Sequence, residues 1–127
     1  MKILSDNEYH KITLENGIVI QTFKLDTLDL KTTQKLVEDR IKAFGDISYP
    51  LIANIRSLKH SSKKAREFFA SDKGCERLIA AALIVDSPLG SMIGNFFVKI
   101  TDPVIPAKVF SNVAEAKRWL EQYVAKI

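Results

Sequence analysis

Residues 78–100 carry the strongest hydrophobic pattern in the chain. Residues 78–85, LIAAALIV, are apolar without interruption, which is typical of a strand that is buried on both faces of a sheet. The alanines at positions 80–82 would let helices pack close to that strand. Ser87 and Pro88 suit the N-cap and the first position of a helix. The pattern therefore predicts a central strand, a turn and a helix over 87–100.

The N-terminal part of the chain predicts a β-hairpin. Residues 11–23 read KITLENGIVIQTF, with Asn16-Gly17 between two runs of strand-forming residues. A type I′ turn needs positive φ at both central residues, and Asn-Gly meets that need well. We expect two antiparallel strands that meet at this dipeptide.

Spacings of three and four residues predict two helices in the middle of the chain. The first follows Asp29, ends at Gly45 and carries Leu30, Thr33, Val37, Ile41 and Phe44 on one side. Residues 50–55 have the length of a strand, and residues 56–62 are expected to form a loop. Ser61 or Ser62 would cap the second helix, whose inner side holds Ala65, Phe68 and Phe69.

The C-terminal region predicts one more strand, over 107–110, and one more helix. Asn112 and Glu115 form a capping box before an apolar face of Val113, Ala116, Leu120, Tyr123 and Ile127. The element order is then β-β-α-β-α-β-α-β-α. This order predicts an α/β fold over 1–127, in which an N-terminal hairpin leads into a mostly parallel sheet with alternating helices.

The composition narrows the class of protein. A chain of 127 residues with 46% hydrophobic and 27% charged residues is expected to fold as one soluble domain. Polar residues appear too early for a signal peptide, and no apolar run approaches the roughly 18 residues of a membrane span. We therefore expect a cytoplasmic protein. The single cysteine, Cys75, excludes an internal disulfide and a cysteine-rich zinc site.

Few residues suit catalysis. Ser61 and Lys64 match the pattern S-x-x-K, but the companion motifs S-D-N and K-T-G are absent, so a capped, basic helix start explains the match better. We expect His10 to be solvated, Cys75 to be inert, and Glu38 and Asp39 to lie on a solvated helix face. We therefore predict no enzymatic activity, no cofactor and no metal site.

Positive charge gathers in residues 56–66, where a parallel strand ends and ligands usually bind in open α/β sheets. Basic side chains in a first helical turn oppose the helix dipole, which favours anions there. An anion-binding or regulatory loop is predicted at Arg56, Lys59, His60, Ser61, Ser62, Lys63 and Lys64. The alternative is a well-solvated basic surface. Nucleic acid is not expected as a partner, because no aromatic residues interleave with these charges.

The helix over 87–100 is apolar around most of its circumference. Only Ser91, Asn95 and Lys99 form a polar strip, whereas covering a sheet needs an apolar stripe of somewhat over 100°. We expect a contact outside the domain core, above all with a second copy in a homodimer. This interaction helix would use Leu89, Met92, Ile93, Phe96, Phe97 and Ile100. The alternative is a helix enclosed by neighbours within its own domain.

Four segments point to a known family: ENGIVIQTF, LIANIRSLKHSSKKAREFFAS, AALIVDSPLGSMIGNFF and AKVFSNVAEAKRWL. Together they resemble small bacterial proteins of the STAS-like superfamily, which includes the anti-sigma-factor antagonists and shares its fold with the CRAL-TRIO lipid-transfer class. The resemblance implies a STAS-like fold with a regulatory serine at the start of the helix after strand 51–55, where Ser61 and Ser62 stand. The antagonists usually have an aspartate just before that serine, where this chain has His60.

The resemblance implies a non-enzymatic regulatory or protein-interaction module. The alternative function is the binding of a lipid or another apolar small ligand. An anionic small ligand would bind at the predicted anion-binding loop, which we also call the basic loop. The helix over 87–100 distinguishes the two functions. A flat apolar outer face would favour a protein partner, and a helix hinged over a cavity would favour a ligand.

Overall fold

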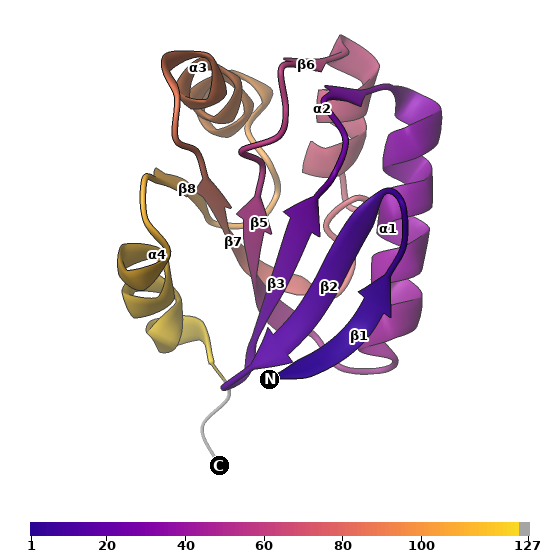
Figure 1. Ribbon diagram of the computed structural model, residues 1–127, viewed down its shortest axis with the longest axis vertical. Helices are drawn as coiled ribbons and strands as arrows, with labels where there is room; N and C mark the ends of the chain where they lie inside the picture. Colours follow the sequence, from indigo (N-terminus) through magenta and orange to yellow (C-terminus); the bar gives the residue numbers. More distant parts are fainter. Residues whose placement is uncertain (125–127) are drawn as a thin grey trace.

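The computed structural model describes residues 1–124 as an α/β domain, in which helices cover both faces of a six-stranded sheet (Figure 1). The strands are β1 (Lys2–Asp6), β2 (His10–Glu15), β3 (Ile18–Phe23), β4 (Thr27–Leu28), β5 (Tyr49–Asn54), β6 (His60–Ser61), β7 (Leu78–Ile84) and β8 (Ala107–Phe110). The helices are α1 (Leu30–Phe44), α2 (Lys63–Ala70), α3 (Pro88–Phe96), the π-helical η1 (Phe97–Thr101), α4 (Val113–Leu120) and the 3₁₀ turn η2 (Glu121–Tyr123). The predicted α/β class is confirmed.

The strand order is β1-β2-β3-β5-β7-β8. The first three strands are antiparallel neighbours, whereas β3, β5, β7 and β8 run parallel to one another. This arrangement agrees with the predicted hairpin followed by alternating strands and helices. The two-residue strands β4 and β6 form a separate parallel pair.

Three details of the predicted topology are wrong. Strand β1 precedes the hairpin, and the sequence signal missed it because β1 is an edge strand with mostly exposed side chains. Strand β7 lies beside the edge strand β8 rather than at the centre, although both of its faces are covered. The loop predicted over 56–62 contains β6, which pairs with residues 27–28.

Individual residues of the local sequence determine the hairpin turn and the start of each α-helix. Asn16 and Gly17 have φ values of 52° and 80°, as a two-residue hairpin turn requires. Each of the four α-helices begins at a side chain that accepts a hydrogen bond from the backbone three residues on. The capping residues are Asp29 (2.7 Å), Ser62 (3.1 Å), Ser87 (3.0 Å) and Asn112 (2.8 Å).

Two cores lie on opposite faces of the sheet. The larger core packs inward-facing side chains of the sheet, such as Val19 and Leu83, against α1, α2 and the α3–η1 segment. The smaller core packs Ile52 and Ile84 against Ala116 and Leu120 of α4. Figure 1 shows α4 at the lower left of the sheet and α3 at the upper left, with α1 and α2 on the right. Strands β5 and β7 are therefore apolar on both faces.

The alanines of β7 serve the two faces differently. Ala80 and Ala82 face α4, where small side chains let the helix approach the sheet. Ala81 has the opposite orientation, because side chains alternate along a strand. It pairs in register with Leu51 of β5 and Ala107 of β8. The short side chain of Ala81 therefore leaves space above the sheet on the side of the larger core.

The helix predicted over 87–100 is divided into α3 and η1. It begins at Ser87 and Pro88 as expected, but its last turn widens to a π-helix that ends at Asp102, whose φ is 57°. Ile127, predicted on the face of the last helix, lies outside the described residues. Within residues 1–124, no helix is long and apolar enough to span a lipid bilayer.

Candidate interaction face and internal cavity

The outer face of α3 and η1 exposes four large apolar side chains. Their exposed fractions are 45% for Leu89, 70% for Met92, 45% for Phe96 and 67% for Ile100. They are spaced by three, four and four residues, so they form one stripe along the helix. We call this stripe the α3 outer face. Exposed apolar stripes of this kind mark contact sites more often than isolated apolar residues do.

The other two residues of the predicted interaction helix have a different orientation. Ile93 and Phe97 are half-buried and pack against the larger core. Gly94 allows the helix to pack this close to β8, because a Cβ added at Gly94 would come within 3.2 Å of Val109 on that strand. The helix thus has an inner side that faces the sheet and an outer side that faces solvent.

Arg66 joins α2 to α3. Its guanidinium lies 4.8 Å from the ring centre of Phe96, and its Nη1 donates to the backbone carbonyl and the hydroxyl of Ser61. The hydroxyl contact is 3.2 Å long. Ser61 is buried in β6, so Arg66 connects three elements around the carboxyl ends of the parallel strands.

A cavity of about 80 Å³ lies between the sheet and the layer formed by α1, α2 and α3–η1. Its floor includes Ala53, Ala81 and Ala107 from three neighbouring parallel strands. Ile93 and Phe97 line it from α3–η1, and Phe69 lines it from α2. The cavity exists because small residues on the floor stand opposite large residues on the helices. Most of its lining is apolar.

Arg40 of α1 brings a charged group to this lining. The side chain is 1% exposed, and its Nη2 donates to the backbone carbonyls of Gly74 at 2.8 Å and Glu76 at 3.1 Å. Its Nε–H has no acceptor in residues 1–124, and no ion pair to Arg40 exists there. Burial lowers the pKa of Arg40 to about 10, so the group stays charged at neutral pH.

Gln21 of β3 adds an acceptor to the same cavity. It is 1% exposed, and its Nε2 lies 2.8 Å from Nδ1 of His10. His10 Nε2 lies 3.2 Å from a carboxylate oxygen of Asp39 and therefore carries the proton. Nδ1 of the neutral ring is then an acceptor, which assigns the amide NH₂ of Gln21 to His10. The Gln21 Oε1 atom has no donor within the described chain.

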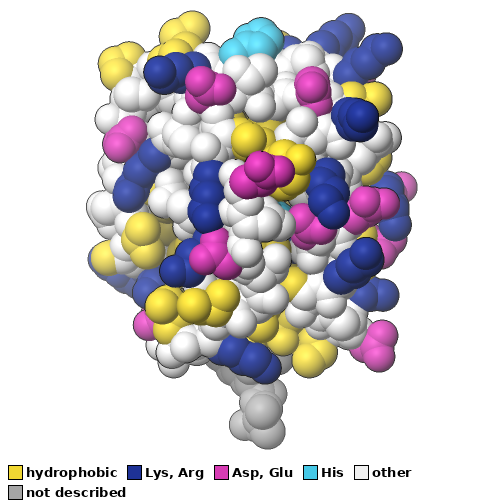
Figure 2. All heavy atoms as spheres, turned by 45° about the vertical axis from the view of Figure 1, so that its right-hand side comes forward, with side chains coloured by type: hydrophobic (Ala, Val, Ile, Leu, Met, Phe, Trp, Pro, Cys, Tyr) yellow, Lys and Arg dark blue, Asp and Glu magenta, His cyan; other side chains and the backbone are white. Residues whose placement is uncertain are grey.

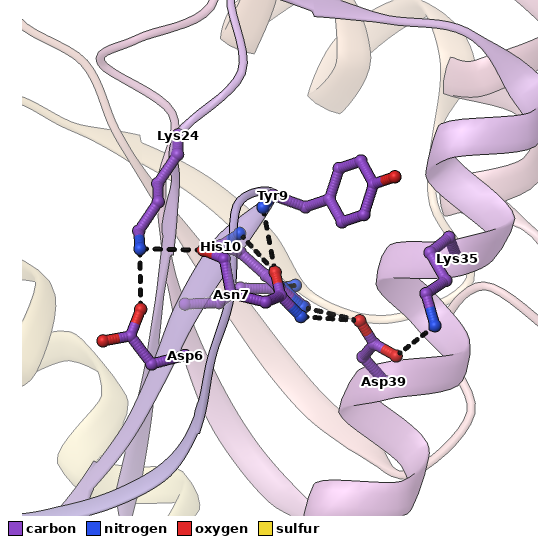
Figure 3. A network of polar contacts seen from close by, with 8 residues as sticks. Asp6, Asn7, Tyr9, His10, Lys24, Lys35 and Asp39 are labelled. Atoms are coloured by element: carbon purple, nitrogen blue, oxygen red, sulfur yellow. Dashed lines mark hydrogen bonds and ion pairs between the residues drawn. The ribbon is translucent and has the colours of Figure 1, made fainter.

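Figure 3 shows the polar network around His10 and Asp39, two residues whose predicted environment was wrong. His10 is fully buried, because its strand position faces α1. Asp39 accepts from His10, from Asn7 Nδ2 at 3.1 Å and from Lys35 Nζ at 3.1 Å. Partial burial would raise the pKa of Asp39, but these hydrogen bonds outweigh it and lower the pKa. Burial lowers the pKa of His10, although Asp39 opposes that shift.

The residues of the predicted anion loop differ in their exposure to solvent. Arg56, Lys59, His60, Lys63 and Lys64 are exposed, whereas Ser61 is buried and bonded to Arg66. Ser62, rather than Ser61, caps α2. Figure 2 shows basic and acidic side chains interspersed over the face in view, with apolar and basic side chains near its upper end. The anion site stays a prediction.

Cys75 lies against the same cavity. It is buried and its Sγ is 3.1 Å from the backbone carbonyl of Phe69. Burial raises the pKa of this thiol, while the charge of Arg40 partly opposes the shift. In the part of the chain that the structure describes, no three His, Cys, Asp or Glu side chains are grouped as metal ligands.

Arg40 and Gln21 are not among the predicted site residues, although the sequence contains a signal for each of them. Arg40 stands between Val37 and Phe44 at helical spacing, so a charge interrupts the buried stripe of α1. Gln21 stands between Val19 and Phe23 on the inward side of β3. A polar residue inside an apolar period is the observation that would have identified both.

A comparison with a solved structure agrees with this architecture. A solved structure of a DUF3478 family protein with a SpoIIAA-like fold, from Shewanella loihica PV-4, matches with a TM-score of 0.55 and 16% identity over 91% of this chain and 97% of that chain. This likeness confirms the STAS-like fold expected from the sequence. A protein of unknown function from an Arthrobacter species (FB24) matches at 20% identity and a TM-score of 0.34, over 87% of this chain and 97% of that chain.

No curated protein matches the sequence. The family described as Domain of unknown function (DUF7793) matches residues 12–124. This range begins at the third residue of β2 and includes all the described helices and strands that follow. The chain belongs to the DUF7793 family.

Proposed function

We propose that the protein is a non-enzymatic interaction module that pairs with a second copy through the α3 outer face. The observation that carries the proposal is the stripe of Leu89, Met92, Phe96 and Ile100, which leaves large apolar side chains in solvent along one helix. Burying such side chains against a partner removes apolar area from water at about 25 cal/mol per Å². A regulatory role fits a surface of this kind on a STAS-like domain.

Charge complementarity favours a second copy as the partner. Asp86 precedes α3 and Lys99 lies near the end of η1, and both are exposed. If two copies of the helix pack antiparallel about a twofold axis between Met92 and Ile93, Leu89 of one copy faces Phe96 of the other. The same register places Asp86 opposite Lys99 of the second copy. Apolar pairs in the centre and opposite charges at both ends make the surface self-complementary.

The polar side chains that could suggest catalysis either form hydrogen bonds with other residues or lie in solvent. The Ser61 hydroxyl accepts from Arg66, while Lys64 points to solvent as an exposed residue. The buried His10 is held between Asp39 and Gln21. These contacts support a non-enzymatic role.

Sedimentation velocity over a range of protein concentrations tests the pairing. One helix face is a small interface, below about 1,200 Å² in total, so the dimer should dissociate on dilution. Met92→Asp should stay folded and sediment as a monomer. The matched control is Ile47→Asp, because Ile47 is also an exposed apolar residue but lies in the loop before β5. A wild-type protein that is monomeric at every concentration would contradict the proposal.

A second function, the binding of an apolar small ligand, is favoured by the cavity beneath α3–η1. Ile93 and Phe97 line this cavity with the inner side of the helix whose outer side carries the exposed stripe. The two functions use opposite sides of one helix and do not compete for the same residues.

A further inference from the structure

We propose that the cavity binds a short-chain carboxylic acid, with its carboxylate on Arg40 and its hydrocarbon chain above the alanine floor. This inference rests on the second function proposed above and names the chemical class of the ligand. It concerns the cavity on the inner side of α3–η1, opposite the α3 outer face, and the lining of this cavity includes Ser61 of the predicted anion loop.

The shape and lining of the cavity determine the size of the hydrocarbon part. Ala53, Ala81 and Ala107 form the floor, and Ile93 and Phe97 lie above it. An engineered apolar cavity of about 150 Å³ in another protein stays dry and admits benzene. The cavity here, at about 80 Å³, has about half that volume, so it suits a short hydrocarbon chain.

Arg40 determines the head group. Arg40 lines the cavity, yet within residues 1–124 its guanidinium contacts only backbone carbonyls and no carboxylate. An unpaired buried charge is far more costly than an unpaired buried amide. A ligand carboxylate would supply both the missing negative charge and an acceptor for the free Nε–H.

Gln21 marks a second polar position in the cavity. The neutral His10 ring fixes the amide of Gln21, so its Oε1 is directed away from the ring and lacks a donor among the described residues. A hydroxyl on the ligand would satisfy this atom. The charge of Arg40 is the stronger requirement, so the carboxylate defines the ligand class.

Amide NMR titration of the wild-type protein with sodium pentanoate, and separately with 1-pentanol, tests the inference. The two probes share a five-carbon chain and differ in the head group. Pentanoate should shift the amides of Ala53, Ala81 and Gly74 and the Nε–H signal of Arg40. It should bind at least about tenfold more tightly than 1-pentanol, because a charge-assisted hydrogen bond contributes about 1.5–3 kcal/mol.

Two variants make the result specific. Arg40→Met should weaken pentanoate binding about tenfold and leave 1-pentanol binding unchanged, whereas Lys64→Met removes an exposed charge and should alter neither. The Arg40 Nε–H signal in the wild type decides the question even if Arg40→Met fails to fold. If 1-pentanol binds as tightly as pentanoate, the carboxylate is wrong although ligand binding survives. If neither probe binds, or if pentanoate shifts only the Lys59–Lys64 surface, both the inference and the second function are wrong.

Discussion

The guanidinium of Arg66 lies 4.8 Å from the ring centre of Phe96, and this contact joins α2 to α3 across the carboxyl ends of the parallel strands. Arg66 also holds the buried Ser61. One side chain therefore connects the basic loop, the α3 outer face and the lining of the cavity. Any movement of α3 away from the sheet must break it.

Replacing Arg66 with Met should loosen α3 more than the rest of the domain. A cation–π contact contributes about 0.5–2 kcal/mol, so the opening of α3 should become several-fold more frequent. Hydrogen exchange of the α3 amides measures this opening. Lys64→Met, on the same helix, is the control that should leave α3 unchanged. Equal exchange in the two variants would show that Arg66 does not hold α3.

The stability of the domain should fall as the pH drops below about 6.5, because burial lowers the pKa of His10. The unfolded chain takes up a proton near pH 6.5 while the folded protein resists it. Below that pH the unfolded state binds more protons, so the free energy of unfolding decreases as the pH decreases. The contribution of His10 is fully present above about pH 6.5 and is lost toward its lowered pKa.

Urea unfolding at about pH 7.5 and about pH 5.5 measures this dependence. The protein supplies its own control, since His60 is exposed and His10 is fully buried. His60→Gln should keep the loss of stability at the lower pH, and His10→Gln should reduce it. The same loss in both variants would assign the titration to another group.

The cap of α2 gives a separate test of local structure. Ser62 accepts a hydrogen bond from Ala65 N at 3.1 Å, so Ser62→Ala should lower the free energy of unfolding by about 1 kcal/mol. Ser48 is exposed in the loop before β5, and Ser48→Ala should have almost no effect. Thermal unfolding of both variants makes the comparison, and equal stabilities would mean that the cap contributes nothing.

Phosphate should shift the amides of Ser62, Lys63 and Lys64 at millimolar concentration if the basic start of α2 binds anions. The first turn of α2 contains no acidic side chain, and a helix N-terminus favours negative charge. An NMR titration with phosphate, compared with sodium chloride of equal ionic strength, separates binding from screening. Absence of phosphate-specific shifts at these residues would make the loop an ordinary solvated surface.

Most elements of this fold could be predicted from the sequence because their signals are local. Asn16-Gly17 encodes a turn through its positive φ values, and Ser87 with Pro88 encodes a helix start. The exposed edge strand β1 and the two-residue strands β4 and β6 could not be predicted in this way. Their pairing depends on neighbours that are distant in the chain.

The candidate sites were harder to predict because they depend on which way a side chain faces. The sequence indicated that the helix over 87–100 is apolar on most sides, but only packing separates the outward Phe96 from the inward Phe97. The same limit explains the errors at His10 and Asp39. The local sequence predicts a surface position for each of them, whereas the contact between β2 and α1 buries His10 fully and Asp39 partly.

The central claim, that two copies pair antiparallel through the α3 outer face, is tested most directly by exchanging the charges at its ends. Asp86→Lys should weaken its own homodimer, because the introduced ammonium group would face Lys99 of the second copy at both ends. Lys99→Asp should weaken its homodimer for the same reason with the opposite sign. In a mixture of the two variants, both ends of the heterodimer join opposite charges.

Native mass spectrometry of an equimolar mixture, with one variant ¹⁵N-labelled, measures the three dimers at once. We predict that the heterodimer exceeds the statistical half of all dimers, and that high salt removes the excess because it screens exposed charges. A spectrum that contains only monomers at every concentration would contradict the pairing. A statistical mixture of homodimers and heterodimers would contradict the antiparallel register.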